Sequence, residues 1–193
     1  MPPKVNTSKY AVLGMLSLGP CSGYDIKKAI DRSIVHFWSE SFGQIYPILR
    51  RLEADGLARR RHERQHGKPE RQVYSLTPRG RAELERWLHT LARPEGFRSE
   101  LLLKLFLGSQ VPAESSMRQI EEFRQRQQTL LATYATIEAE LRAKATREPN
   151  VAYWLITLRF GQRRASALAL WAEESLRELA RLQRARQPRR RGA

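Results

Sequence analysis

The chain has 193 residues, 41% of them hydrophobic and 28% charged, proportions that are ordinary for about one or two soluble globular domains. Lys and Arg outnumber Asp and Glu by 35 to 20, which leaves a formal net charge of +15. Such an excess indicates a polyanion or an acidic membrane surface as partner, with a generic solvated basic surface as the alternative. A single cysteine, Cys21, excludes an intramolecular disulfide and fits a reducing compartment.

No segment resembles a signal peptide or a membrane span. The N-terminal ten residues lack an apolar run, and the longest apolar stretch, 101–107, is short and interrupted by Lys104. The sequence therefore predicts a cytoplasmic protein that does not enter a membrane.

After an arm at 1–7, the pattern predicts two short helices. The first begins near Ser8 as N-cap and stops at Gly19-Pro20. The second follows Ser22, which forms a capping-box pattern with Asp25 three residues later. Its apolar stripe is Ile26, Ile30 and Ile34.

A third helix is predicted to end at Gly56, a residue typical of helix C-caps. Its inner face carries Ile45, Leu49 and Leu52. Pro47 lacks an N–H and is tolerated only in the first turn or at a kink. The helix is therefore expected to begin between Ser41 and Gly43, with Ser39 or Ser41 as the cap.

The period then changes from helical to alternating. Residues 57–64 and 71–77 are predicted as two strands, joined by turn-forming residues at 65–69. Thr77-Pro78 marks the start of a fourth helix. That helix is expected to bury Leu84, Trp87, Leu88 and Leu91. The order helix-helix-helix-hairpin-helix predicts a winged helix-turn-helix domain over 1–92.

The second half, 93–187, is predicted to be helical and mainly coiled-coil-like. A hinge at 93–96 leads to a short apolar helix ending at Gly108, and a long helix begins at Val111-Pro112. Apolar residues recur in it at heptad spacing: Ile120, Phe123, Leu130, Tyr134, Ile137 and Leu141, with Gln127 as the polar member. A last helix runs from about 151 to 187, and a basic disordered tail, 188–193, follows.

Two long amphipathic helices without a sheet must bury their apolar stripes on each other and on further surface. A homodimer through the C-terminal helices is the prediction. The alternative is a monomeric helical hairpin folded onto the first domain.

A winged helix-turn-helix places its third helix in the major groove of double-stranded DNA. Residues near the start of that helix would then reach base edges, and Arg51 would meet phosphate. The candidate base contacts are Gln44, Tyr46, Pro47 and Arg50. Gln can bond adenine with two hydrogen bonds, and Arg can bond guanine.

The hairpin is predicted as a second contact region. It carries six cations and the acids Glu63 and Glu70; the cations are Arg59, Arg60, Arg61, Arg64, Lys68 and Arg71. With His66 near its tip, it suits phosphates or a minor groove. The alternative is an ordinary solvated hairpin. Tyr24, Lys27 and Lys28 of the second helix are further candidate phosphate contacts.

Catalysis finds no support in the residue pattern. The four histidines lack metal-ligand spacing, Cys21 has no cysteine partner, and no phosphate-binding glycine loop is present. The sequence predicts no enzyme, no metal and no cofactor, and Cys21 is expected to be a packed or turn residue.

Several motifs resemble the PadR-like transcriptional regulators. They are YAVLGML at 10–16, GPCSGYDI at 19–26, FWS at 37–39, GQIYPIL at 43–49, RLEADGL at 51–57, YSLT at 74–77 and Gly80. The resemblance covers the first ninety residues or so. The second half, with Trp154 and the long last helix, resembles the larger subfamily that carries a helical C-terminal dimerisation domain.

This resemblance implies a homodimeric repressor whose two recognition helices read successive major grooves of a palindromic operator. It also implies release by a small effector, a phenolic acid in the name-giving members and other amphipathic compounds elsewhere. By motif position it carries over as DNA contacts Tyr24, Ser39, Gln44, Tyr46, Pro47 and Lys68.

An effector pocket between the domains would draw on aromatic side chains. The candidates are Trp87, Phe97, Phe106, Trp154 and Trp171, for which plain core packing is the alternative. An interaction module whose winged helix binds protein is the competing function of a different class.

Overall fold

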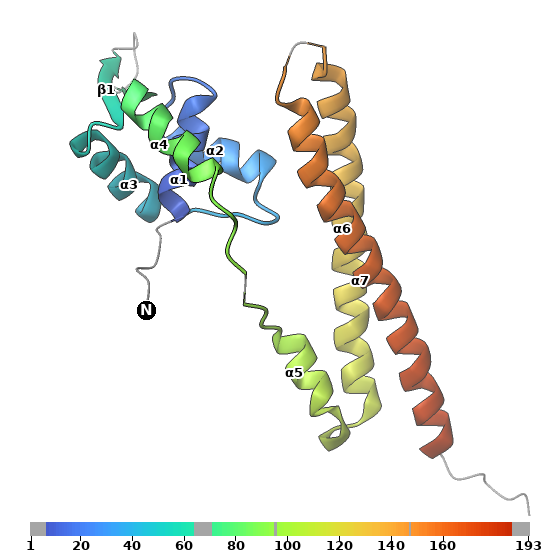
Figure 1. The fold of residues 1–193 in the computed structure, drawn as a ribbon. Coiled ribbons are helices and arrows are strands. Elements are labelled where there is room, and N and C mark those ends of the chain that lie inside the picture. Colours follow the sequence, from blue (N-terminus) through green and yellow to red (C-terminus); the bar gives the residue numbers. More distant parts are fainter. Residues whose placement is uncertain (1–6, 64–70, 95, 147, 187–193) are drawn as a thin grey trace, which may run out of the picture. The chain divides into compact units, whose positions relative to one another are not determined.

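The computed structural model describes residues 7–63, 71–94, 96–146 and 148–186. The chain divides into two compact units, Met1–Pro94 and Glu95–Ala193 (Figure 1). The first unit consists of α1 (Thr7–Ser17), α2 (Gly23–Ser33), α3 (Phe42–Ala54), β1 (Ala58–Glu63), β2 (Arg71–Leu76) and α4 (Pro78–Leu88). This order confirms the predicted winged helix-turn-helix.

Local sequence signals begin and end these helices where they were predicted to. Ser22 caps α2 in a full capping box with Asp25, and Ser41 is the N-cap residue of α3. Thr77 caps α4, with Pro78 as its first residue. Gly56 has φ +68° just after α3, and the N–H of Leu57 donates to the carbonyl of Leu52 at 2.8 Å. The exception is α1, which begins at Thr7 and so includes Ser8.

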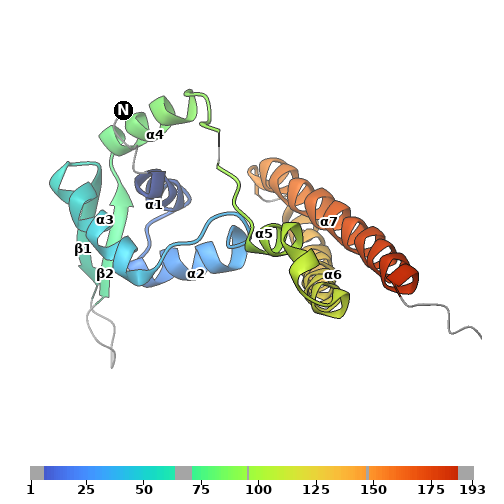
Figure 2. The ribbon, with the colours of Figure 1, turned by 90° about the horizontal axis from the view of Figure 1, so that it is seen from below.

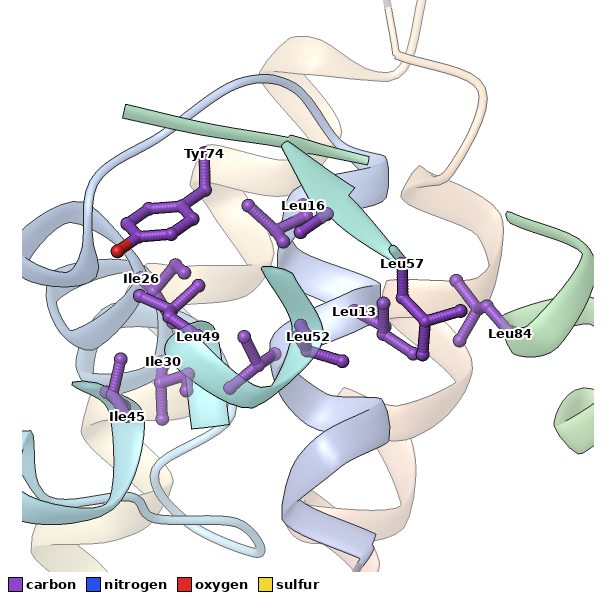
Figure 3. Packing of buried hydrophobic residues seen from close by; sticks show 12 residues of the cluster. Leu13, Leu16, Ile26, Ile30, Ile45, Leu49, Leu52, Leu57, Tyr74 and Leu84 are labelled. Atoms are coloured by element: carbon purple, nitrogen blue, oxygen red, sulfur yellow. The ribbon is translucent and has the colours of Figure 1, made fainter. Parts of the chain in front are cut away.

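One apolar core joins the helices of the first unit to its sheet (Figure 3). Helices α2 and α3 contribute the stripes that their spacing predicted, and α1 adds Leu13 and Leu16, so that the three helices meet around a common centre. The labelled members, all at most 7% exposed, are Leu13, Leu16, Ile26, Ile30, Ile45, Leu49, Leu52, Leu57, Tyr74 and Leu84. This burial holds α3 with its opposite face towards solvent.

The wing is an antiparallel pair in which Ala58 lies opposite Leu76 and Glu63 opposite Arg71. Cys21 extends it as an isolated bridge, because its N–H donates to the carbonyl of Tyr74 at 3.0 Å and the Tyr74 N–H returns the bond at 2.9 Å. Burial raises the pKa of the Cys21 thiol, and the nearby Arg71 opposes the shift. A thiol that stays protonated is a poor nucleophile, as predicted for a packed residue.

Helix α4 is tied to α1 by a polar and aromatic cluster. The rings of Tyr10 and Trp87 stack at 4.6 Å, and Glu83 accepts hydrogen bonds from Lys9 at 2.7 Å and from Tyr10 at 3.0 Å. The hydrogen bond from Lys9 is the largest cause of the lowered pKa of Glu83.

The prediction that α4 buries Leu88 and Leu91 is wrong. These side chains are 65% and 95% exposed, and the helix ends at Leu88. Trp87 already stacks on Tyr10, near the start of α1, so the next residues of α4 run past the end of the helix that covers it.

The second unit is a helical hairpin with a short helix beside it. It consists of α5 (Glu100–Phe106), a 3-10 turn η1 (Gly108–Gln110), α6 (Ala113–Lys144) and α7 (Val151–Arg186). The long helices α6 and α7 run side by side in both views (Figure 2). Tyr134, Leu158 and Ala165 form the centre of their interface, and Phe123 meets Trp171 edge to face at 5.7 Å. The predicted heptad residues of α6 are thus buried or half-buried.

The second unit leaves much apolar surface uncovered. Helix α5 buries none of its residues, and Leu103 and Phe106 are 60% and 86% exposed. On α7, Ile156 and Phe160 are 61% and 66% exposed. Among the described residues, no helix combines the length and the hydropathy needed to span a bilayer.

Candidate nucleic-acid interface

The outward face of α3 presents the side chains that were predicted to contact bases. Ile45, Leu49 and Leu52 hold the opposite face in the core. All five predicted contacts of this helix are exposed: Gln44, Tyr46, Pro47, Arg50 and Arg51. Because the buried stripe occupies one side of α3 only, the first three turns offer these groups together to an external partner.

Hydrogen bonds to Ser41 fix the orientation of the Gln44 side-chain amide. Its Oε1 accepts from the backbone N–H of Ser41 at 2.9 Å and from the Ser41 hydroxyl at 2.9 Å. A backbone N–H can only donate, so the amide atom that faces it is the oxygen. The Nε2 group is therefore the part of Gln44 left for a partner, and it can only donate. The two-bond adenine contact, which also needs Oε1, requires opening this cap.

Pro47 lies in the second turn of α3, beyond the first turn that was expected to hold it. Its missing N–H would have bonded the carbonyl of Gly43, four residues earlier. The proline thus leaves one backbone carbonyl of α3 without its usual intrahelical donor.

The predicted cations divide into paired and unpaired groups. Lys27 pairs with Asp31, Arg61 with Glu63, Arg60 with Glu53 at 3.1 Å, and Arg51 with Asp55 at 3.9 Å. In contrast, Lys28, Arg50 and Arg59 are exposed and form no ion pair with any residue of the described segments. Unpaired exposed cations keep their full charge for an approaching phosphate.

Arg71, predicted as a wing contact, lies against α2. Its guanidinium pairs with the carboxylate of Asp25, which also accepts from the N–H and hydroxyl of Ser22, each at 2.8 Å. One carboxylate therefore caps α2 and anchors the first residue of β2. This contact makes Arg71 a positioning residue for the wing.

Other predicted residues lie at the margin of this surface or outside the described part. Tyr24 is 58% exposed at the start of α2, and Ser39 is exposed in the segment before α3. Arg64, His66 and Lys68, with the predicted turn at 65–69 and the tail at 188–193, fall outside the described residues. Their assignment stays a prediction.

The aromatic residues proposed for an effector pocket belong to different units. Trp87 stacks on Tyr10 in the first, whereas Phe97, Phe106 and Trp154 belong to the second, where Phe97 is 74% exposed. Their role stays a prediction. The second unit has a cavity of its own, of about 440 Å³, lined by α5, α6 and α7 with Leu105, Ile120, Trp171 and Leu179 among its walls.

Two residues near the N-terminal end of α3 were not identified from the sequence pattern. Phe42, its first residue, is 43% exposed between Tyr24 and Tyr46. Glu40 is only 3% exposed and accepts from the indole N–H of Trp38 at 2.9 Å. An apolar residue next to a predicted N-cap was the signal for Phe42, but no sequence pattern marked the burial of Glu40.

The described residues contain no group of three or more His, Cys, Asp or Glu side chains arranged to hold a metal ion. The interface is built from hydrogen-bond donors, aromatic rings and cations. These are the groups that bind nucleic acid.

Two family models match the chain. The "Transcriptional regulator PadR-like family" matches residues 12–86, and "Virulence activator alpha C-term" matches residues 97–180. The first match covers most of the winged helix and the second covers α5, α6 and most of α7.

Similar proteins include the negative transcriptional regulator PadR of Bacillus subtilis, which is 30% identical over 173 residues, 87% of this chain and 94% of that protein. The crystal structure of Bacillus subtilis PadR in complex with operator DNA has a TM-score of 0.79 at 27% identity, over 90% of this chain and 99% of that one. The complex of the same protein with p-coumaric acid has a TM-score of 0.72 at 26% identity, over 93% and 99%.

The double use of Asp25 predicts an unequal response to two aspartate substitutions on α2. Asp25→Ala removes both a capping box and the anchor of Arg71, and should lower the free energy of unfolding by about 1–2 kcal/mol. Asp31→Ala removes only an exposed pair with Lys27 and should cost about 0.5 kcal/mol or less. Urea denaturation followed by circular dichroism measures both. Equal costs would contradict the anchoring role of Asp25.

Proposed function

Since this chain belongs to the PadR-like family of transcriptional regulators, we propose that it is a repressor that binds a specific operator in double-stranded DNA. The observation that carries the proposal is the exposed face of α3, where the Gln44 amide donor, Tyr46 and Arg50 stand together. Binding DNA through this surface requires no catalytic step. The proposal is therefore a cytoplasmic regulator that is not an enzyme.

In this proposal, residues 1–92 form the DNA-binding domain and α3 enters the major groove. The Gln44 Nε2 group donates to an acceptor on a base edge, such as guanine N7 or O6, adenine N7 or thymine O4. Arg50 donates hydrogen bonds to guanine. Tyr24, Ser39 and Pro47 are proposed as further DNA contacts. These positions are supported by their exposure on the face opposite the core.

Phosphate binding is assigned to the cations around α3. Lys28 and Arg59 have no ion-pair partner among the described residues, and each can replace a counterion on the DNA backbone. Lys27, Arg51 and Arg61 can join them by exchanging an exposed carboxylate partner for a phosphate. Such exposed pairs are worth at most about 1 kcal/mol, so the exchange is inexpensive.

The repressor is proposed to be a homodimer through the helices of 93–187. The exposed apolar side chains of α5 and α7, among them Phe106 and Phe160, need a covering surface, and a second copy supplies it. A two-fold dimer presents two copies of α3, which matches a palindromic operator whose half-sites lie in successive major grooves.

Release by a small aromatic acid is proposed as the control of this repressor. The support is the p-coumaric acid complex of Bacillus subtilis PadR, together with the aromatic residues Phe97, Phe106 and Trp154 of the second unit. An aromatic ring and a carboxylate suit a site that combines such side chains with the basic residues of this protein.

Fluorescence anisotropy of the full-length protein on DNA from its own upstream region tests the function, with a shuffled duplex as control. Nanomolar binding to the native fragment, at least about a hundredfold tighter than to the control, is the expected result at physiological salt. Sedimentation of the free protein should give a dimer. Equal, salt-sensitive binding to both duplexes would reject sequence recognition and favour an interaction module.

The polarity of Gln44 predicts an unusually harmful conservative substitution. Gln44→Glu keeps the acceptor for Ser41, so the melting temperature should not change, but an oxygen replaces the Nε2 donor. Operator affinity should fall about tenfold or more relative to the shuffled duplex. Lys28→Ala, which loses only a phosphate contact, should weaken binding to both duplexes alike. A Gln44→Glu protein with unchanged operator preference would contradict the donor role.

Effector release gives a separate prediction. Added p-coumaric acid should dissociate the operator complex, raising the apparent Kd about tenfold or more at saturation. Trp154→Ala should reduce this response, whereas Tyr153→Ala, at the neighbouring exposed position, should keep it. Anisotropy titrations with the acid measure both. An operator complex that is indifferent to p-coumaric acid would reject this effector while leaving the DNA-binding proposal in place.

A further inference from the structure

Three aromatic rings form a continuous strip where the N-terminal ends of α2 and α3 meet. The rings of Tyr24 and Phe42 are 6.3 Å apart at an interplanar angle of 9°, and those of Phe42 and Tyr46 are 6.3 Å apart at 23°. We call these residues, Tyr24, Phe42 and Tyr46, the aromatic strip. It combines one residue of α2 with two residues of α3.

The strip depends on a close approach of the two helices. A Cβ atom on Gly23 would lie 2.7 Å from Cε1 of Tyr46, so any larger residue would force the ring to move. Glycine at the first position of α2 therefore lets the Tyr46 ring lie against the helix backbone. Phe42 then fits between the rings of Tyr46 and Tyr24.

The strip is solvent-exposed although its rings stack on one another. Tyr24 is 58%, Phe42 43% and Tyr46 40% exposed. The two tyrosine hydroxyls can hydrogen-bond with water, but Phe42 has no polar atom. Each exposed aromatic face forgoes the stabilisation that burial would bring. A partner that covers the central ring with an apolar group would recover it.

The charges beside the strip indicate what that partner is. The Nζ of Lys27, which is paired with Asp31, lies 6.0 Å from the centre of the Phe42 ring. The exposed Lys28, which has no ion-pair partner among the described residues, follows it on α2. Arg50 is exposed further along α3. An apolar strip beside exposed cations complements a polyanion that carries apolar groups along its grooves.

We propose that Phe42 contacts the 5-methyl group of a thymine in the major groove of the operator, so that the aromatic strip selects thymine at one position of each half-site. The inference rests on the proposed function. The thymine methyl is the apolar group that base pairs present in the major groove. Phe42 lies in the first turn of α3, the helix proposed to enter the groove. The thymine methyl is therefore the apolar group that its ring can contact there. Tyr24 and Tyr46 hold the ring in place by stacking on either side of it.

Removal of single methyl groups tests the proposal. Each thymine of the operator is replaced in turn by deoxyuridine, which deletes the methyl and leaves the hydrogen-bonding edge intact. For the wild-type full-length protein, anisotropy should show a loss of about fourfold in affinity at one thymine per half-site, the value of one buried methyl group. At the other thymines the affinity should change less than twofold or so.

A second set of measurements assigns the methyl effect to Phe42. Phe42→Ser should bind the thymine and deoxyuridine operators equally, which is the coupling expected of a direct contact. Phe42→Leu keeps an apolar side chain and should retain part of the effect. Phe37→Ser, which changes another exposed phenylalanine of the same unit, should keep the full fourfold difference.

The outcomes separate this inference from the proposed function. Specific operator binding with no deoxyuridine effect at any thymine, or with an effect that persists in Phe42→Ser, overturns the thymine contact alone. A persistent effect would assign the methyl to another side chain. Failure of the wild-type protein to prefer any operator overturns the proposed function, and the thymine contact with it.

Discussion

The close packing of α2 on α3 is the constraint on which the candidate interface depends. Two layers of contact produce it: Ile26 and Ile30 meet Ile45 and Leu49 in the core, and Tyr46 lies against the backbone at Gly23 nearer the surface. Because the buried stripe of α3 fills one side of that helix, the core determines which residues face outward. The rotation of α3 about its own axis is thus set by hydrophobic burial, and the donors, rings and cations of the interface follow from it.

Around that packed centre, polar contacts position the two strands of the wing. Asp25 joins the start of α2 to the first residue of β2 through Arg71, and Glu53 joins α3 to β1 through Arg60. These pairs are partly exposed, so each contributes little to stability. Their effect is geometric: they connect the two strands of the wing to α2 and α3, the helices that carry the candidate DNA contacts. Arg60 and Arg71 therefore act in orientation, while Lys28, Arg50 and Arg59 keep their charge for a partner.

The second unit is also held together by the burial of apolar side chains. The long helices α6 and α7 bury Tyr134, Leu158 and Ala165 against each other, but their outer faces and α5 keep large apolar side chains exposed. A helical hairpin has no second layer with which to cover such faces. The exposed residues of α5 and α7 are therefore consistent with the proposed second copy, and a dimer would also supply the pair of recognition helices that a palindromic operator requires.

Helix order, caps and the strand pair could be read from the sequence by itself, since they depend on local signals such as Ser22 with Asp25, Gly56, Thr77-Pro78 and the change from helical to alternating period. The outward residues of α3 followed from the same periodicity. Only the tertiary structure decided that Arg60 pairs with Glu53 and Arg71 with Asp25, that Leu88 is exposed, and that Phe42 lies between Tyr24 and Tyr46. These properties depend on which side chains meet across separate elements, and spacing along one element carries no information about its neighbours.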